Sequence, residues 1–119
     1  MEIPQRVGGF RHAFAGLHLA WGEANFRFHI ISAVVALLLS WILHISLLEL
    51  ALVVFAVGLV LATEALNTSL EEFCDHVTPE EHINIARVKD IAAAAVFISS
   101  ATAFVIGCII FIPHLIAFL

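Results

Sequence analysis

The sequence predicts an all-α integral membrane protein with three transmembrane helices in a single domain, 1–119. Hydrophobic residues make up 62% of its 119 residues, above the roughly 45–50% of soluble domains, and its mean hydropathy is +1.07. Three stretches contain no Asp, Glu, Lys or Arg, namely 28–48, 50–63 and 91–119. A helix needs about 20 residues to cross about 30 Å of hydrocarbon. The expected spans are therefore about 28–46, 49–70 and 90–112.

Before the first span, residues 4–21 are expected to form an amphipathic helix on the membrane surface. Apolar side chains recur there every three or four residues, which places them on one face. They are Val7, Phe10, Phe14, Leu17 and Trp21. A basic amphipathic helix in this place lies in the membrane interface. It acts either as an anchor only, or as an anchor in which Arg6 or Arg11 also contacts a phosphate group.

The distribution of Lys and Arg predicts the orientation in the membrane. All five lie before the first span or between the second and third, at Arg6, Arg11, Arg27, Arg87 and Lys89. Because cytoplasmic segments carry the excess of these residues, the N-terminus and the 71–90 loop are expected in the cytoplasm and the C-terminus outside. No signal peptide is expected, since residues 1–27 lack a continuous apolar core.

Short connections are predicted between the spans. The turn over 44–49 is brief enough to make the first two spans antiparallel neighbours. Thr78 and Pro79 suit the N-cap and first residue of a helix. A short cytoplasmic helix over about 79–88 is therefore expected to precede the third span.

A polar stripe follows the apolar run of the second span. It consists of Glu64, Asn67, Glu71 and Asp75. In a helix these residues fall within roughly 80° of one another. About 14 uncharged residues are too few to cross the bilayer, so the helix must continue past Glu64 and bury it. Glu71 then lies about 10 Å further along, near the headgroups.

The polar stripe has the residue types that phosphoryl transfer needs. A carboxylate in a dry environment, such as Glu64, can hold or take a proton near neutral pH. Carboxylates at the water edge suit Mg²⁺, which is bound by one or two of them together with substrate phosphates. Glu23 and Glu71 are the candidates to hold Mg·ATP. Lys89, near the same level, can neutralise phosphate charge. The predicted reaction moves phosphate from a nucleotide to a lipid hydroxyl, with Glu64 as its base.

Other interpretations of these acids remain open. Buried acids also serve proton or cation pathways, so an oligomeric conductor that uses Glu64 is the alternative function. The stripe could instead be structural, with its acids paired to Arg87 or Lys89. Glu72 and His76, four residues apart, make half a transition-metal site without a further ligand at suitable spacing. The sequence also has no Walker A or kinase-type glycine loop, so any nucleotide site is of another kind.

Three motifs together resemble the prokaryotic integral-membrane diacylglycerol kinase family, over about residues 8–112. They are Glu23-x-Asn25-x-Arg27, Glu64-x-x-Asn67-Thr-Ser-Leu-Glu71-x-x-x-Asp75 and Ala86-x-x-Lys89-Asp90. The family includes diacylglycerol kinases and undecaprenol kinases. The extension of the first motif to His29 and the ending Phe-Ile-Pro113 are more similar to the undecaprenol kinase branch.

The resemblance implies a homotrimer in the bacterial inner membrane, with ATP and Mg²⁺ at composite sites between subunits. It implies a lipid alcohol, diacylglycerol or undecaprenol, as the acceptor. Glu64 resembles the catalytic base, and Glu23 and Glu71 resemble the ligands of the metal and nucleotide. The remaining site residues by resemblance are Asn67, Asp75, Lys89 and Asp90. Phe28 and His29 replace a polar pair of the diacylglycerol branch, and Ala93 stands where some members have Ser, so the choice of lipid stays open.

An oligomer is also expected on physical grounds. Three helices of one small chain cannot enclose a polar stripe on all sides. Polar groups that face lipid are costly, so neighbouring chains should cover the stripe.

Overall fold

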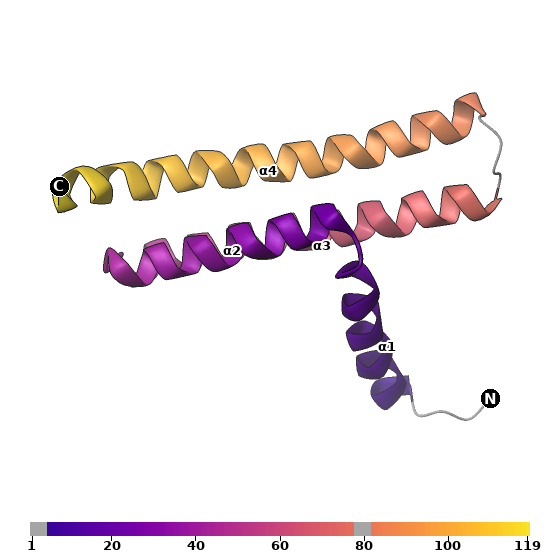
Figure 1. Cartoon of the computed structure of the whole chain (residues 1–119), viewed down its shortest axis with the longest axis horizontal. Coiled ribbons are helices and arrows are strands. Elements are labelled where there is room, and N and C mark those ends of the chain that lie inside the picture. Colours follow the sequence, from indigo (N-terminus) through magenta and orange to yellow (C-terminus); the bar gives the residue numbers. More distant parts are fainter. Residues whose placement is uncertain (1–4, 78–81) are drawn as a thin grey trace.

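The structure is a computed structural model that describes residues 5–77 and 82–119, and within these residues all regular secondary structure is helical (Figure 1). Its elements are α1 (Gln5–Ala20), α2 (Ala24–Ile42), α3 (Leu47–Val77) and α4 (Ile83–Phe118). Three of them, α2, α3 and α4, are long and apolar enough to cross a membrane. The predicted all-α, three-span class is therefore confirmed.

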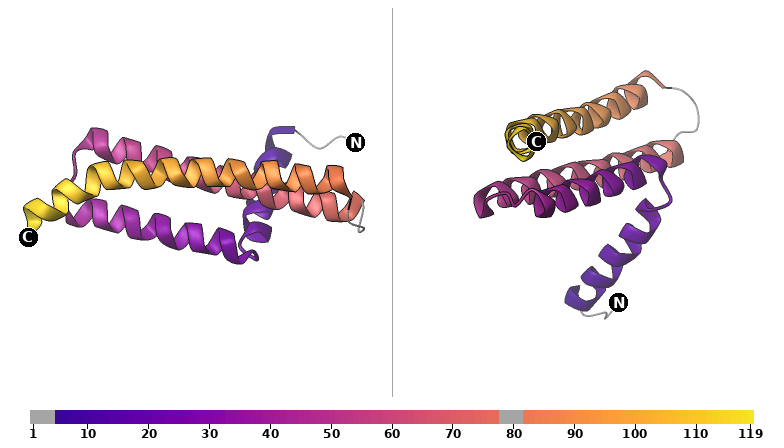
Figure 2. Two further views of the ribbon diagram at one scale, coloured as in Figure 1. Left: turned by 90° about the horizontal axis from the view of Figure 1, so that it is seen from above. Right: turned by 60° about the vertical axis from the view of Figure 1, so that its left-hand side comes forward.

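The three long helices run side by side, and α3 is the one that contacts both others. Figure 2 shows α4 lying along α3 while α2 packs on another side of it. Helix α1 leaves this group at a steep angle after the bend at 21–23 (Figure 1). Its large apolar side chains, such as Phe10 and Phe14, are exposed. The predicted helix at 4–21 thus exists as α1, and its placement on a membrane surface stays a prediction.

The predicted connection between the second and third spans was wrong in its details. Helix α3 continues to Val77, and α4 runs unbroken from Ile83, so most of the expected 71–90 loop is helical. There is no separate helix over the described part of 79–88, because good helix formers such as Ala86, Arg87 and Lys89 join it to the third span. His82 caps α4 by accepting a hydrogen bond from the Asn84 N–H, at 3.1 Å. The cap expected at Thr78 and Pro79 lies outside the described residues.

The first turn was placed nearly correctly, and a capping box defines its end. The Ser46 N–H donates to Glu49 Oε1 at 2.9 Å, and the Glu49 N–H donates to Ser46 Oγ at 3.1 Å. Such reciprocal bonds satisfy backbone donors at a helix start. Helix α2 ends at Ile42, four residues before the predicted end of the first span at residue 46. His44, in the turn, has a φ of 52°, a left-handed conformation that does not continue a helix. His114 of α4 adds a bond to Glu49 at 3.0 Å, which ties α4 to this end of α3.

Small side chains fill the contacts between the helices, and large apolar ones point outward. Ala33, Ala56 and Ala92 are buried, whereas Phe55, Phe97 and Phe104 are exposed. Small residues at helix contacts allow close packing in membranes. So much exposed apolar surface is incompatible with a free monomer in water. It suits helices surrounded by lipid or by other subunits.

One polar contact joins α3 and α4 midway along their apolar lengths. The hydroxyls of Thr63 and Ser99 lie 2.6 Å apart, and Ser99 is only 3% exposed. Each hydroxyl also bonds a backbone carbonyl of its own helix. If either hydroxyl is removed, the remaining one therefore still has a hydrogen-bond partner in its own helix.

Substitution of Ser99 should separate the hydrogen bond from the close packing. We expect Ser99→Ala to lower the free energy of unfolding by about 0.6 kcal/mol, the average for such bonds in membranes. Ser99→Leu should cost several times more, because its side chain would force α3 and α4 apart. Denaturant titration in mixed micelles measures both. Thr102→Ala is the control, since this exposed hydroxyl bonds only Ile98 of its own helix, and an equal loss in all three variants would contradict the assignment.

Candidate functional site

Glu64 is the buried end of the polar stripe. It lies on α3 just after the uncharged run 50–63, and it is 3% exposed. Because α3 continues without a break to Val77, Asn67, Glu71 and Asp75 follow it on the same helix as predicted. Glu71 and Asp75 are exposed, so the stripe passes from a dry position to a wet one.

A histidine from α2 faces Glu64. His29 Nε2 lies 3.7 Å from Glu64 Oε2, with side-chain exposures of 16% and 4%. From the sequence, His29 bore only on the branch of the family and the choice of lipid, and its contact with Glu64 was not predicted. The signal available in the sequence was a histidine at the start of a span whose partner span contains a buried acid.

Lys89 of α4 contacts the solvent-exposed end of the polar stripe, at Asp75. Its Nζ donates to Asp75 Oδ1 at 2.6 Å, and its charge also acts on Glu71. Charge-assisted bonds of this length are the stronger kind, although both side chains are accessible to solvent, at 37% and 69% exposure. The pairing fits a phosphate-binding lysine held in place, and it equally fits the structural pairing that the sequence left open.

Asn67 differs from its neighbours in the stripe because it faces a cavity between α3 and α4. The other lining residues are apolar apart from Thr63, and they include Leu70 and Ala92. Its Oδ1 is buried and has no hydrogen-bond partner in the described part of the chain. A buried polar atom without a partner costs stability, so this amide needs a functional or intersubunit explanation.

Glu23 lies at the junction of α1 and α2. It occupies the N-cap position of α2 without making a side-chain cap bond. It borders a hollow between α1 and α3, together with Thr68 and Glu72. The charges of Glu23 and Glu71 are both close enough to act on Glu64. Among the described residues, however, no three Asp, Glu, His or Cys side chains come close enough together to hold a metal ion.

Two further predicted residues, Arg11 and Asp90, lie outside α3. Arg11 is exposed on α1, which projects away from α3 and α4 (Figure 1). Asp90 is exposed on α4 next to Lys89. Any role for Arg11 at the phosphates would need the site of a neighbouring subunit.

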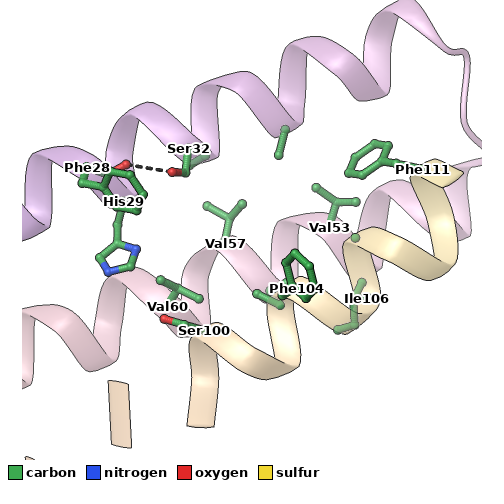
Figure 3. Close-up of a pocket in the computed structure, with 15 residues that line it drawn as sticks. Phe28, His29, Ser32, Val53, Val57, Val60, Ser100, Phe104, Ile106 and Phe111 are labelled. Carbon is green, nitrogen blue, oxygen red and sulfur yellow. Dashed lines mark hydrogen bonds between the residues drawn. The ribbon is translucent and has the colours of Figure 1, made fainter. Parts of the chain in front are cut away.

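A cavity of about 390 Å³ runs between α2, α3 and α4 on the apolar side of His29. Figure 3 shows the imidazole of His29 reaching from α2 toward α3 at one end of it. The other lining residues are mostly apolar, such as the valines of α3 and Phe111, and the polar ones among them are Ser32 and Ser100. Val60, one turn before Glu64, belongs to the lining, whereas Glu64 itself does not.

Similarity to known proteins identifies the class of enzyme to which this fold and these residues belong. The profile of the prokaryotic diacylglycerol kinase family matches residues 11–111. The chain is 33% identical over 115 residues to the undecaprenol kinase of Bacillus subtilis, covering 96% of this chain and 94% of that protein. It is 31% identical over 104 residues to the diacylglycerol kinase of Escherichia coli K12, covering 87% and 85%. This chain belongs to the prokaryotic diacylglycerol kinase family.

Replacement of Asn67 should distinguish a functional amide from a structural one. We expect Asn67→Leu to leave the unfolding free energy unchanged or higher, because it removes an unpaired polar atom and fills the cavity. Turnover should fall about 10- to 100-fold if the amide binds a reacting group. Unfolding and lipid phosphorylation assays measure the two effects. Leu70→Met, in the same cavity, is the control for repacking, and full turnover in Asn67→Leu would exclude a role in the reaction.

Proposed function

We propose that this chain is an ATP-dependent lipid kinase that acts at the cytoplasmic membrane interface. It transfers the γ-phosphate to the hydroxyl of a lipid alcohol, converting diacylglycerol to phosphatidic acid or undecaprenol to undecaprenyl phosphate. The observation that carries the proposal is the buried Glu64 at the dry end of a polar stripe, in a chain of this family. Both acceptors stay open, because the relatives include kinases named for each. Membership of a kinase family does not favour the alternative of a proton or cation conductor.

Glu64 is the proposed catalytic base. It accepts the proton of the lipid hydroxyl, whose oxygen forms a bond to the γ-phosphorus. The bond from that phosphorus to the β–γ bridging oxygen breaks, and its electron pair leaves with ADP. A carboxylate next to hydrocarbon is poorly solvated, which favours its taking up a proton. Its position inside the apolar part of α3 also makes it accessible to the hydroxyl of a lipid alcohol in the membrane.

Glu23 and Glu71 are the proposed ligands of Mg²⁺. Carboxylate oxygens are donors that this cation prefers, and the negative charges of both side chains act on Glu64. Bound Mg²⁺ would neutralise charge on the phosphates during transfer. Lys89, held by Asp75, would bind phosphate oxygens, and Asn67 and Asp90 would complete the nucleotide site.

We also propose a homotrimer whose surface helix supplies Arg11 to a neighbouring subunit. The exposed apolar faces of α2–α4 and the projecting α1 support this arrangement (Figure 2). The Lys and Arg distribution supports a cytoplasmic N-terminus in the bacterial inner membrane. Cross-linking and mass measurement of the purified oligomer test the trimer.

The central test is an assay of the purified protein in lipid with Mg·ATP and either diacylglycerol or undecaprenol. Formation of a phosphorylated lipid supports the proposal, and the ratio of the two rates identifies the acceptor. Folded protein that phosphorylates neither lipid would refute it. Proton flux into liposomes without ATP would favour the conductor instead.

Glu64→Gln should abolish turnover while the oligomer remains intact. It keeps the shape of the side chain and removes the base, whose loss costs about 10²- to 10⁴-fold. The lipid assay and the oligomer mass are the measurements. Glu49→Gln, the same change in the first turn of α3, is the matched control and should keep its turnover. Near wild-type activity of Glu64→Gln would exclude this residue as the base.

Glu71→Gln and Glu23→Gln should raise the Mg²⁺ concentration needed for half-maximal activity, because each removes one anionic ligand. We expect a shift of about tenfold or more, in line with the loss of a metal-site contact. Titration of activity with Mg²⁺ at fixed ATP measures it. An unchanged Mg²⁺ requirement would show that these carboxylates do not bind the metal, and Glu49→Gln again serves as the control.

A further inference from the structure

His29 occupies the boundary between the cavity and Glu64. Its side chain lines the cavity, whereas the Glu64 carboxylate lies behind it, 3.7 Å from Nε2. Figure 3 shows the ring pointing from α2 across to α3. A hydroxyl that reaches Glu64 from the cavity side therefore passes the imidazole first.

The imidazole is held in this position by its own helix. The rings of Phe28 and His29 meet edge to face, with centroids 5.5 Å apart, a favourable geometry for aromatic pairs. The neighbouring cation, Arg27, is directed elsewhere, since its guanidinium donates to the Trp21 carbonyl at 3.3 Å. His29 is thus the basic group that α2 presents to Glu64.

The two groups lie close to each other without forming a hydrogen bond. At 3.7 Å the imidazole nitrogen and the carboxylate oxygen are beyond hydrogen-bond distance. Catalytic hydrogen bonds tighten in the complex with substrate, and this separation is short enough for such a bond to form. A small movement of either side chain would bring Nε2–H and Oε2 into contact.

We infer that His29 is a positioning residue for Glu64, an inference that rests on the proposed kinase function. The imidazole donates its Nε2–H to Oε2 and fixes the carboxylate at the end of the cavity. The second oxygen, Oε1, then accepts the proton of the lipid hydroxyl while that oxygen bonds to the γ-phosphorus and ADP departs. His29 itself keeps its proton and forms no covalent bond.

Three substitutions at position 29 test this role. His29→Gln keeps an amide donor where Nε2 stands, His29→Asn places its donor nearer to Nδ1, and His29→Leu removes the donor at similar volume. We expect the kcat of His29→Leu to fall about 10- to 100-fold, as for a base displaced by about 1 Å, with the KM for Mg·ATP unchanged. His29→Gln should recover most of the kcat, and His29→Asn should not.

The controls separate this inference from loss of folding and from the kinase proposal. His18→Leu, an exposed histidine on α1, should keep the wild-type kcat. If His29→Leu fails to assemble, the comparison of Gln with Asn decides the matter alone. Equal activity of the Gln and Asn variants, a raised lipid KM with normal kcat, or full activity of His29→Leu would overturn the positioning role. Wild-type protein without lipid kinase activity would instead overturn the proposed function.

Discussion

The structure depends on the burial of one carboxylate inside an apolar helix. An acid inside a membrane span is costly, up to about 2.5–3.5 kcal/mol at the centre on insertion scales, so the surroundings of Glu64 must offset part of that cost. His29 provides a polar neighbour from α2. The small side chains of Ala33 and Ala56, both buried, allow α2 to approach α3 closely. The packing of these two helices is therefore tied to the site and not only to the stability of the fold.

Because α3 and α4 are both unbroken, the polar side chains near the buried Glu64 hold fixed positions along the two helices. Because α3 remains helical from Leu47 to Val77, the seven residues from Glu64 to Glu71 span about 10 Å along one face. An unbroken α4 presents Lys89 to Asp75 at a fixed height. A separate helix before the third span would have allowed this lysine to move independently of the membrane-buried part.

The sequence was sufficient for the parts of the structure that local patterns determine. Apolar runs predicted three spans, and helical spacing predicted the polar stripe. The predicted end of a short helix before Asp90 was wrong. Thr78 and Pro79 indicate where a helix starts, but its continuation into the third span is indicated only by the absence of a helix breaker after Arg87. The His29–Glu64 contact joins residues 35 positions apart. It depends on how α2 is rotated against α3, which apolar periodicity fixes only loosely.

A single chain encloses the buried part of the candidate site, around Glu64, more completely than the exposed part, around Glu71 and Asp75. Glu64 is enclosed by its own helices, yet Glu71 and Asp75 are exposed and Arg11 lies on the projecting α1. A nucleotide bound by this chain alone would be open to solvent on one side. The lysine nearest to it, Lys89, is already paired with Asp75. Water would screen each of those contacts. The exposed apolar faces of the same helices are surfaces that another subunit can cover. A single physical requirement, the exclusion of water and lipid from the polar stripe, therefore connects the proposed trimer with the proposed phosphoryl transfer.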